Sequence, residues 1–341
     1  PCGSHLNNVP DISKSNDYNI IELWSKQQAG EIDFSKRLFE HKYNKQPRDV
    51  FGDTKYHSKR TEEESWHDKW GVYFLSLANK DQEFRNFLNK KGYCAEDIVA
   101  GNHEANPFLR KIAPIVAFKD ALVNDEGSRK SRKNIEEFYS GWEAIAIISE
   151  GNPRWLIAML NTLNSKISIE TGRISSADQS RILTSSSKAY AAMLKTTSTS
   201  MNMGITTRKR PYDVVKMIAD YFINRLLKES FKEDLPLSFT VDDKVDEDTK
   251  SALRIALNYG AIVSLSESGD ITDYQNLNNK RYRISFMLSP VLNLPLRASK
   301  SVSLSSIIKT PKEKISKDVK AFKLEPNKVI RNIQGNLFDE S

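Results

Sequence analysis

Apolar residues spaced three or four positions apart run through the first two thirds of the chain, and this spacing requires a fold built mainly from helices. The pattern is clearest in Trp70, Phe74 and Leu77, and it returns in Phe84 and Phe87. Residues at these intervals fall on one face of a helix. We interpret both sets as helix faces buried in a core, and not as the lining of a ligand pocket.

The composition is typical of a globular protein. Of 341 residues, 39% are apolar and 28% are charged, and the length allows two or three domains. No run of about 18 apolar residues predicts a membrane span, and residues 1–5 do not resemble a secretory signal. Two cysteines, Cys2 and Cys94, cannot form a disulfide framework or a cysteine-rich zinc site. We therefore expect a cytoplasmic protein.

Two kinds of catalytic centre find no support in the sequence. No serine lies in a Gly-x-Ser-x-Gly pattern, which is typical of serine hydrolases. All five histidines fall in the first third of the chain, and no pair has the spacing of metal ligands on a helix, so we expect no metal site. The histidines are His5, His41, His57, His67 and His103.

The charge is basic and unevenly placed. The formal net charge is +7, and residues 291–341 hold ten Lys or Arg against five Asp or Glu, which is about +5 of the total. An excess of this size is common among nucleic-acid-binding proteins, but it does not identify one by itself.

The periodicity divides the first 210 residues into helices and breaks. A charged stretch over 43–64 interrupts the first helical region with a loop, and Gly151 and Pro153 separate two later helices. Ser175 or Ser176 can cap the helix that follows, because a serine hydroxyl accepts from the free backbone N–H groups there. We expect helices within 34–122, over 135–150 and 155–163, and from about 176 to 194.

A new module begins at Pro211, which suits the first turn of a helix. After that helix, residues 235–241 alternate as a strand, and Asp248 can cap a second helix that ends before Gly260. Two strands over 261–265 and 282–288 then form a hairpin with a long polar tip. Helix, strand, helix and hairpin is the order of a winged helix, although one helix is missing between the first strand and the hairpin.

The sharpest motif is Gly151-Asn152-Pro153-Arg154, between two helices. Gly151 and Pro153 allow a tight break, and Arg154 then projects from the first turn of the next helix. A guanidinium fixed at that position suits a phosphate, because it offers planar donors and a permanent charge. On spacing alone, an ordinary helix corner with a surface arginine is the favoured interpretation of the motif.

The segment Tyr139-Ser140-Gly141-Trp142, followed by Ile148 to Arg154, resembles the lid of origin-recognition-type (initiator-like) AAA+ ATPases of the bacterial and archaeal kind. The resemblance covers roughly residues 18–300. It implies that Arg154 is the second sensor, which touches the nucleotide γ-phosphate, and that ATP and magnesium are the cofactors of the complete protein. The module after Pro211 is similar to the winged helix that follows this lid.

One part of the ATPase pattern is missing. A phosphate-binding loop needs Gly-Lys-Ser/Thr, and none of the 14 glycines precedes a lysine. No apolar strand ends in the Asp-Glu pair that would hold magnesium. The chain is therefore expected not to hydrolyse ATP alone. It is either the C-terminal part of a longer ATPase, which we favour, or its ATP machinery is lost or supplied by another chain.

The winged-helix module offers two candidate DNA-binding elements. The helix carries Lys250 and Arg254, but a run of carboxylates from Asp242 to Asp248 precedes it and would repel phosphates. The wing is the better candidate, and we expect it to contact the backbone or the minor groove. A winged helix used for protein contacts is the alternative. The candidate residues of the wing are Lys280, Arg281 and Arg283.

The C-terminal tail ends in a second short motif. Gln334, Leu337 and Phe338 resemble the Gln-x-x-Leu-Phe peptides that dock on bacterial sliding clamps. An apolar pair on a flexible tail suits a groove, although the same pair can also pack on its own domain.

The predicted fold is mainly α with a small α+β winged-helix module. The predicted function is the coupling of ATP state to the binding of duplex DNA or a partner, which is a core ATPase chain or a second copy. The alternative is a non-catalytic scaffold that binds a partner protein. The expected parts are a partial ATPase-core-like and helical region (1–134), a lid-like helical domain (135–210), the winged helix (211–300) and a flexible basic tail (301–341).

Overall fold

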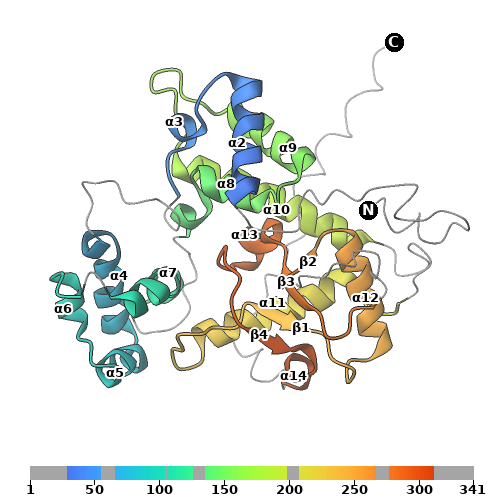
Figure 1. The fold of residues 1–341 in the computed structure, drawn as a ribbon. Coiled ribbons are helices and arrows are strands. Elements are labelled where there is room, and N and C mark those ends of the chain that lie inside the picture. The colour runs from blue at the N-terminus through green and yellow to red at the C-terminus, as the bar shows by residue number, and fades with distance from the viewer. Residues whose placement is uncertain are drawn as a thin grey trace, which may run out of the picture. The chain divides into compact units, whose positions relative to one another are not determined.

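The computed structural model describes residues 29–54, 66–103, 106–125, 135–197, 207–265 and 276–310. Helices form most of this part (Figure 1), as the apolar spacing predicts. The first two are α2 (Ala29–Tyr43) and α3 (Pro47–Phe51). Helix α3 begins at Pro47, whose fixed φ suits a first helical turn, and it lies inside the stretch that the sequence assigned to a loop.

A group of four helices follows (Figure 1), in which α4 contacts the other three. The helices are α4 (Trp66–Lys80), α5 (Gln82–Lys90), α6 (Ala95–Val99) and α7 (Pro107–Leu122). Phe74, Leu77 and Phe84 are fully buried, so the predicted apolar faces do form a core. Burying an aliphatic or aromatic side chain of this size contributes about 1.5–3 kcal/mol.

The next segment departs from the single helix expected over 135–150. It forms a short 3₁₀ turn η1 (Glu136–Tyr139) and then α8 (Trp142–Ile148). Gly141 separates them with φ +87°, a conformation that ends a right-handed helix. Helices α9 (Pro153–Asn164) and α10 (Ser176–Thr196) follow, and Ser175 caps α10 as predicted, because its side chain accepts from the backbone N–H of Asp178.

The module after Pro211 has the predicted order of elements. It comprises α11 (Pro211–Leu227), β1 (Ser238–Thr240), α12 (Glu247–Asn258), β2 (Ile262–Ser264) and β3 (Arg281–Ile284). Two details differ: Asp246 and not Asp248 caps α12, and the second hairpin strand ends at Ile284. The chain then turns into η2 (Phe286–Leu288) and α13 (Ser289–Leu292).

Two further elements occupy residues that the sequence assigned to a flexible tail. They are β4 (Ser301–Ser303) and α14 (Leu304–Lys309). The sheet has the strand order β2-β3-β1-β4, in which β3 pairs antiparallel with β1 and β2, and β4 pairs parallel with β1. Leu304 and Ile307 are buried, so apolar burial holds this last segment on the module.

The described residues from Ala29 to Lys309 belong to one compact unit. Within the described part of the chain, no helix is long and apolar enough to cross a membrane. In the same residues, no group of three His, Cys, Asp or Glu side chains is placed to hold a metal ion.

Candidate functional site

The turn between α8 and α9 presents Arg154. Glu150 and Gly151 both adopt positive φ, +54° and +65°, which reverses the chain within two residues. Asn152 then caps α9, since its side-chain oxygen accepts from the backbone N–H groups of Arg154 (3.0 Å) and Trp155 (3.3 Å). Pro153 occupies the first helical position. Arg154 follows with its side chain exposed to solvent.

This position suits a guanidinium that meets an anion. The N-terminal end of a helix carries partial positive charge, so a cationic side chain there is not stabilised by the helix itself. The first backbone N–H groups of α9 are already bonded to Asn152. Any contact to a phosphate at this turn therefore depends on the side chain of Arg154 and not on a nest of backbone donors.

Glu150 ties the same turn to the hairpin. Its carboxylate accepts from both terminal nitrogens of Arg283, at 2.7 Å and 2.6 Å, and from the backbone N–H of Phe286. The side chains of Arg283 and Glu150 are only 3% and 8% exposed. A bidentate pair in a buried site fixes both backbones, because neither charge can return to water without breaking it.

The position of Arg283 corrects its predicted role. The guanidinium carbon of Arg283 lies 4.0 Å from the centre of the Phe286 ring, and Glu150 binds its terminal nitrogens. In this arrangement Arg283 stabilises the junction between β3 and the α8–α9 turn and does not face solvent, so we do not keep it as a DNA contact.

Two aromatic residues complete the junction between the predicted lid region and the C-terminal module. The rings of Trp155 and Tyr190 lie 4.8 Å apart, and the Tyr190 hydroxyl donates to the carbonyl of Tyr259 at 2.7 Å. Gly260 follows with φ +75°, and a Cβ there would meet Trp155 at 3.5 Å. The residue next to Arg154 thus packs against the end of α12.

The Tyr139 hydroxyl forms a second link to the C-terminal module. It lies 3.1 Å from the carbonyl oxygen of Ser289 and 2.8 Å from that of Leu294. Tyr139 is fully buried, and burial raises the pKa of its phenol well above the usual value. The Tyr139 hydroxyl therefore stays protonated throughout the physiological pH range and keeps its hydrogen bonds to these carbonyls.

Helix α12 does not present the predicted DNA-binding residues freely. Lys250 is 8% exposed, and Arg254 is bonded to Glu247 and Ser251. Most of the helix is buried against α11, β2 and neighbouring residues. A recognition helix needs one open face to enter a groove, and α12 lacks such a face over its central turns.

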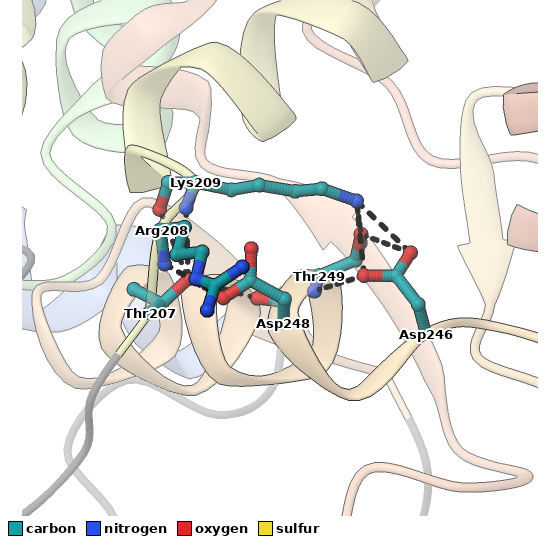
Figure 2. A network of polar contacts seen from close by, with 6 residues as sticks. All are labelled: Thr207, Arg208, Lys209, Asp246, Asp248 and Thr249. Carbon is teal, nitrogen blue, oxygen red and sulfur yellow. Dashed lines mark hydrogen bonds and ion pairs between the residues drawn. The ribbon is translucent and has the colours of Figure 1, made fainter.

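The acidic first turn of α12 is held by the segment before α11 (Figure 2). The Lys209 ammonium donates to both carboxylate oxygens of Asp246 at 2.9 Å and to the Thr249 hydroxyl at 2.6 Å. Asp248 accepts from the Thr207 hydroxyl (3.0 Å) and from the backbone N–H of Arg208 (2.6 Å). The charge of Asp246 is therefore balanced by the Lys209 ammonium, and the Asp248 carboxylate is stabilised by hydrogen bonds from the same segment.

Hydrogen bonding also sets the protonation of Asp246. Partial burial favours its neutral form, but bonds from Lys209 and Thr249 outweigh that effect and lower its pKa from 3.8 to about 2. The carboxylate is ionised at neutral pH, so Asp246 keeps its ion pair with Lys209 under physiological conditions.

Two of the three predicted wing residues, Lys280 and Arg281, lie near solvent. Asn279 is exposed, with φ +60°, and Lys280 and Arg281 are partly exposed. The Arg281 side chain donates to the Ser238 hydroxyl at 3.0 Å and to the carbonyl of Ser299. Arg281 therefore fastens the hairpin to β1 and the segment before β4, and Lys280 lies next to it.

The clamp-like residues Gln334, Leu337 and Phe338 lie outside the described part of the chain, and their docking stays a prediction. Sequence reasoning missed Glu150 and Tyr139 as junction residues. Both lie in the motifs that carried the resemblance, but nothing in their spacing revealed partners more than 130 residues away.

Comparison with known proteins identifies the family. A family model described as ORC-CDC6-like matches residues 3–304. The chain belongs to the ORC-CDC6-like family. No curated protein and no solved structure matches it. The initiator-like AAA+ family that the sequence suggested is thereby confirmed at this level.

Membership in the ORC-CDC6-like family implies ATP as a cofactor. The residues of this chain show whether it has the groups that a nucleotide site requires. A nucleotide needs a loop of backbone donors and a lysine around its phosphates, but no glycine of the sequence precedes a lysine. The first N–H groups of α9 are taken by Asn152. The described residues thus do not fit a complete nucleotide site, and a phosphate contact of Arg154 stays a prediction.

Proposed function

We propose that this chain acts as the lid and winged-helix part of an origin-recognition-like AAA+ protein and binds duplex DNA through the β2–β3 hairpin. The order α11–β1–α12–β2–β3, with β3 between β2 and β1, supports the winged-helix interpretation. Only α12 lies between β1 and β2, so this module has one helix fewer than the usual winged-helix order.

The burial of α12 is the observation that carries this proposal. A helix that is packed on most of its faces cannot enter a major groove, and its charged residues Lys250 and Arg254 are buried or paired. The hairpin instead places Asn279 and Lys280 near solvent. Amide and ammonium donors suit phosphate oxygens or the minor groove, so Lys280 is our first candidate contact and Arg281 a second.

Arg154 is proposed to contact a nucleotide phosphate that is bound outside the described residues. The support is its exposed place on the first turn of α9 and the family membership. Glu150, four residues earlier, joins the same turn to β3. A movement of this turn would therefore be transmitted to β3 through the buried Glu150–Arg283 pair. In this way the ATP state would alter DNA binding by the hairpin.

Equilibrium titration of a fluorescent duplex, over a series of salt concentrations, tests the DNA-binding proposal. We expect binding that weakens steeply with salt, because phosphate contacts release counterions. Lys280→Ala should lower the slope of log K against log[salt] by about 0.9, the contribution of one contact. Lys90→Ala is the matched control, since Lys90 is an exposed lysine on α5. Absent or salt-independent binding by the unmodified chain would reject the proposal.

The Arg154 proposal is tested by the same titration with and without Mg-ATP, on the complete assembly. ATP should change the DNA affinity of the unmodified protein and leave that of Arg154→Ala unchanged. An Arg154→Ala protein that still responds fully to ATP would exclude the role, while DNA binding itself would stand.

A protein-interaction scaffold is the second candidate function. Several large apolar side chains are exposed, most of all Ile169 at the tip of the α9–α10 loop, and exposed apolar groups favour protein contacts. Such a scaffold would show no salt-sensitive DNA binding. The other exposed apolar residues among those described are Phe34, Val72, Met193 and Ile308.

A further inference from the structure

Helix α10 carries three basic residues on one exposed face. Arg181, Lys188 and Lys195 are seven positions apart, which is close to two helical turns, so they share one side and lie about 10.5 Å apart along the axis. All three are exposed to solvent. Together they form a row about 21 Å long.

Beyond Arg181, helix α10 itself adds no opposing charge to this face. The sequence of α10 after Asp178 contains no Asp or Glu, and Asp178 itself pairs with Arg181. Between the cations, the exposed positions Ser185, Ala189 and Ala192 are small, and Met193 is the one large apolar side chain exposed on this helix. Small side chains allow another backbone to approach the helix closely, within reach of the long basic side chains.

The row continues at the start of α11. The Lys195 ammonium lies 4.7 Å from the centre of the Tyr212 ring, which places the end of α10 beside the first turn of α11. Arg210 precedes this turn and is exposed. The carboxylate of Asp213 is the one acidic group of that turn, whereas Asp246 is engaged by Lys209 (Figure 2).

We propose that the exposed face of α10, together with Arg210, is a second nucleic-acid contact that binds the backbone phosphates of duplex DNA. This inference rests on the proposed DNA-binding function and adds a surface outside the hairpin. A straight row of cations, spaced regularly and without a large apolar centre, matches a phosphate backbone better than it matches a folded protein surface, whose interface core is apolar. Contacts of this kind fix position and do not read sequence.

The test compares three proteins in duplex-DNA titrations at several salt concentrations. They are the full chain, the variant Lys188→Ala/Lys195→Ala and the control Lys36→Ala/Lys90→Ala, which removes equal charge from exposed positions on α2 and α5. Two lost phosphate contacts should lower the salt slope by about 1.8 and weaken binding about 60-fold at 0.1 M salt. The control should bind like the unmodified chain, and thermal melting should be unchanged in both variants.

The outcomes separate this inference from the function on which it rests. If the α10 variant binds DNA within threefold of the unmodified chain while Lys280→Ala weakens binding, the α10 surface is excluded and the hairpin proposal stands. If the α10 variant weakens binding on random and defined duplexes alike, the inference is supported. If the unmodified chain does not bind DNA at all, both proposals fail.

Discussion

Single residues decide whether the chain can turn between η1 and α8, and Gly141 is the clearest case. Its φ of +87° lies outside the range of ordinary residues, and a Cβ would lie 2.5 Å from the Thr54 nitrogen and 2.6 Å from the Asp53 carbonyl. Its N–H also donates to the Gln179 side chain at 2.8 Å. The close backbone approach and the left-handed φ both require glycine.

Gly141→Ala should therefore destabilise the fold by about 3 kcal/mol or more, because strain and steric overlap add. Gly172→Ala provides the matched control: its φ is +66°, but nothing lies within 4 Å of the added Cβ, so only about 1 kcal/mol of strain is expected. Urea unfolding measures both free energies. Equal losses in the two variants would show that the contact with residues 53 and 54 is not tight.

At the scale of elements, the cap of α12 links stability to pH. The pKa of Asp246 is about 2 in the folded chain, below its ordinary value of 3.8. A group whose folded pKa is lowered stabilises the fold above its unfolded pKa, and this contribution is lost as pH falls from about 4 to 2. The side chain is about half exposed, so solvent screening keeps the effect small.

Asp246→Asn and Asp246→Ala separate the charge from the cap. Asparagine retains an oxygen that can accept from the N–H of Thr249, whereas alanine loses the cap at a cost of about 0.5–2 kcal/mol. At pH 7 we expect the order of stability to be Asp, then Asn, then Ala. Between pH 4 and 2, the unmodified chain should lose its advantage over the Asn variant in chemical unfolding. A constant difference across that range would contradict the linkage.

Local signals predicted several elements well. Pro211 and the apolar spacing after it gave the start of α11, and Ser175 was correctly predicted to cap α10. Local signals failed where a distant segment decides the outcome. Gly141 breaks a helical pattern because residues 53 and 54 pack against it, and β4 forms because β1 accepts a fourth strand.

The candidate site shows the same division. The turn at Arg154 follows from Asn152 and Pro153, which are local signals for a helix start. The pairing of Glu150 with Arg283 does not, because a carboxylate in a sequence does not indicate which cation it will meet. The expected DNA contact at Arg283 was replaced by this pair for that reason.

At the scale of the whole molecule, the Glu150–Arg283 pair joins segments 133 residues apart. Removing one partner leaves a buried charge unpaired, so Glu150→Gln and Arg283→Met should each cost about 3–5 kcal/mol. The double variant should cost clearly less than the sum of the two losses. A double-mutant cycle by urea unfolding gives this coupling, and additive losses would mean that the two side chains are independent.

The last described elements also belong to the folded unit. Leu304 and Ile307 of α14 are 0% and 2% exposed, and each contributes about 1.5–3 kcal/mol by burial. A chain ended at residue 300 should therefore be about 3–6 kcal/mol less stable than one ended at residue 310. Thermal and urea unfolding of the two truncated chains measure the difference. Equal stability would place β4 and α14 outside the cooperative core.

The link from Tyr139 to the carbonyls of Ser289 and Leu294 has a consequence for the order of folding. The backbone hydrogen bonds of a helix such as α10 join residues four positions apart. The Tyr139 hydroxyl instead bonds to carbonyls at least 150 residues later in the chain. Closing so long a loop is entropically costly, and contacts of this kind slow folding. We therefore expect that η1 acquires its final environment late, only after the C-terminal module has assembled around it.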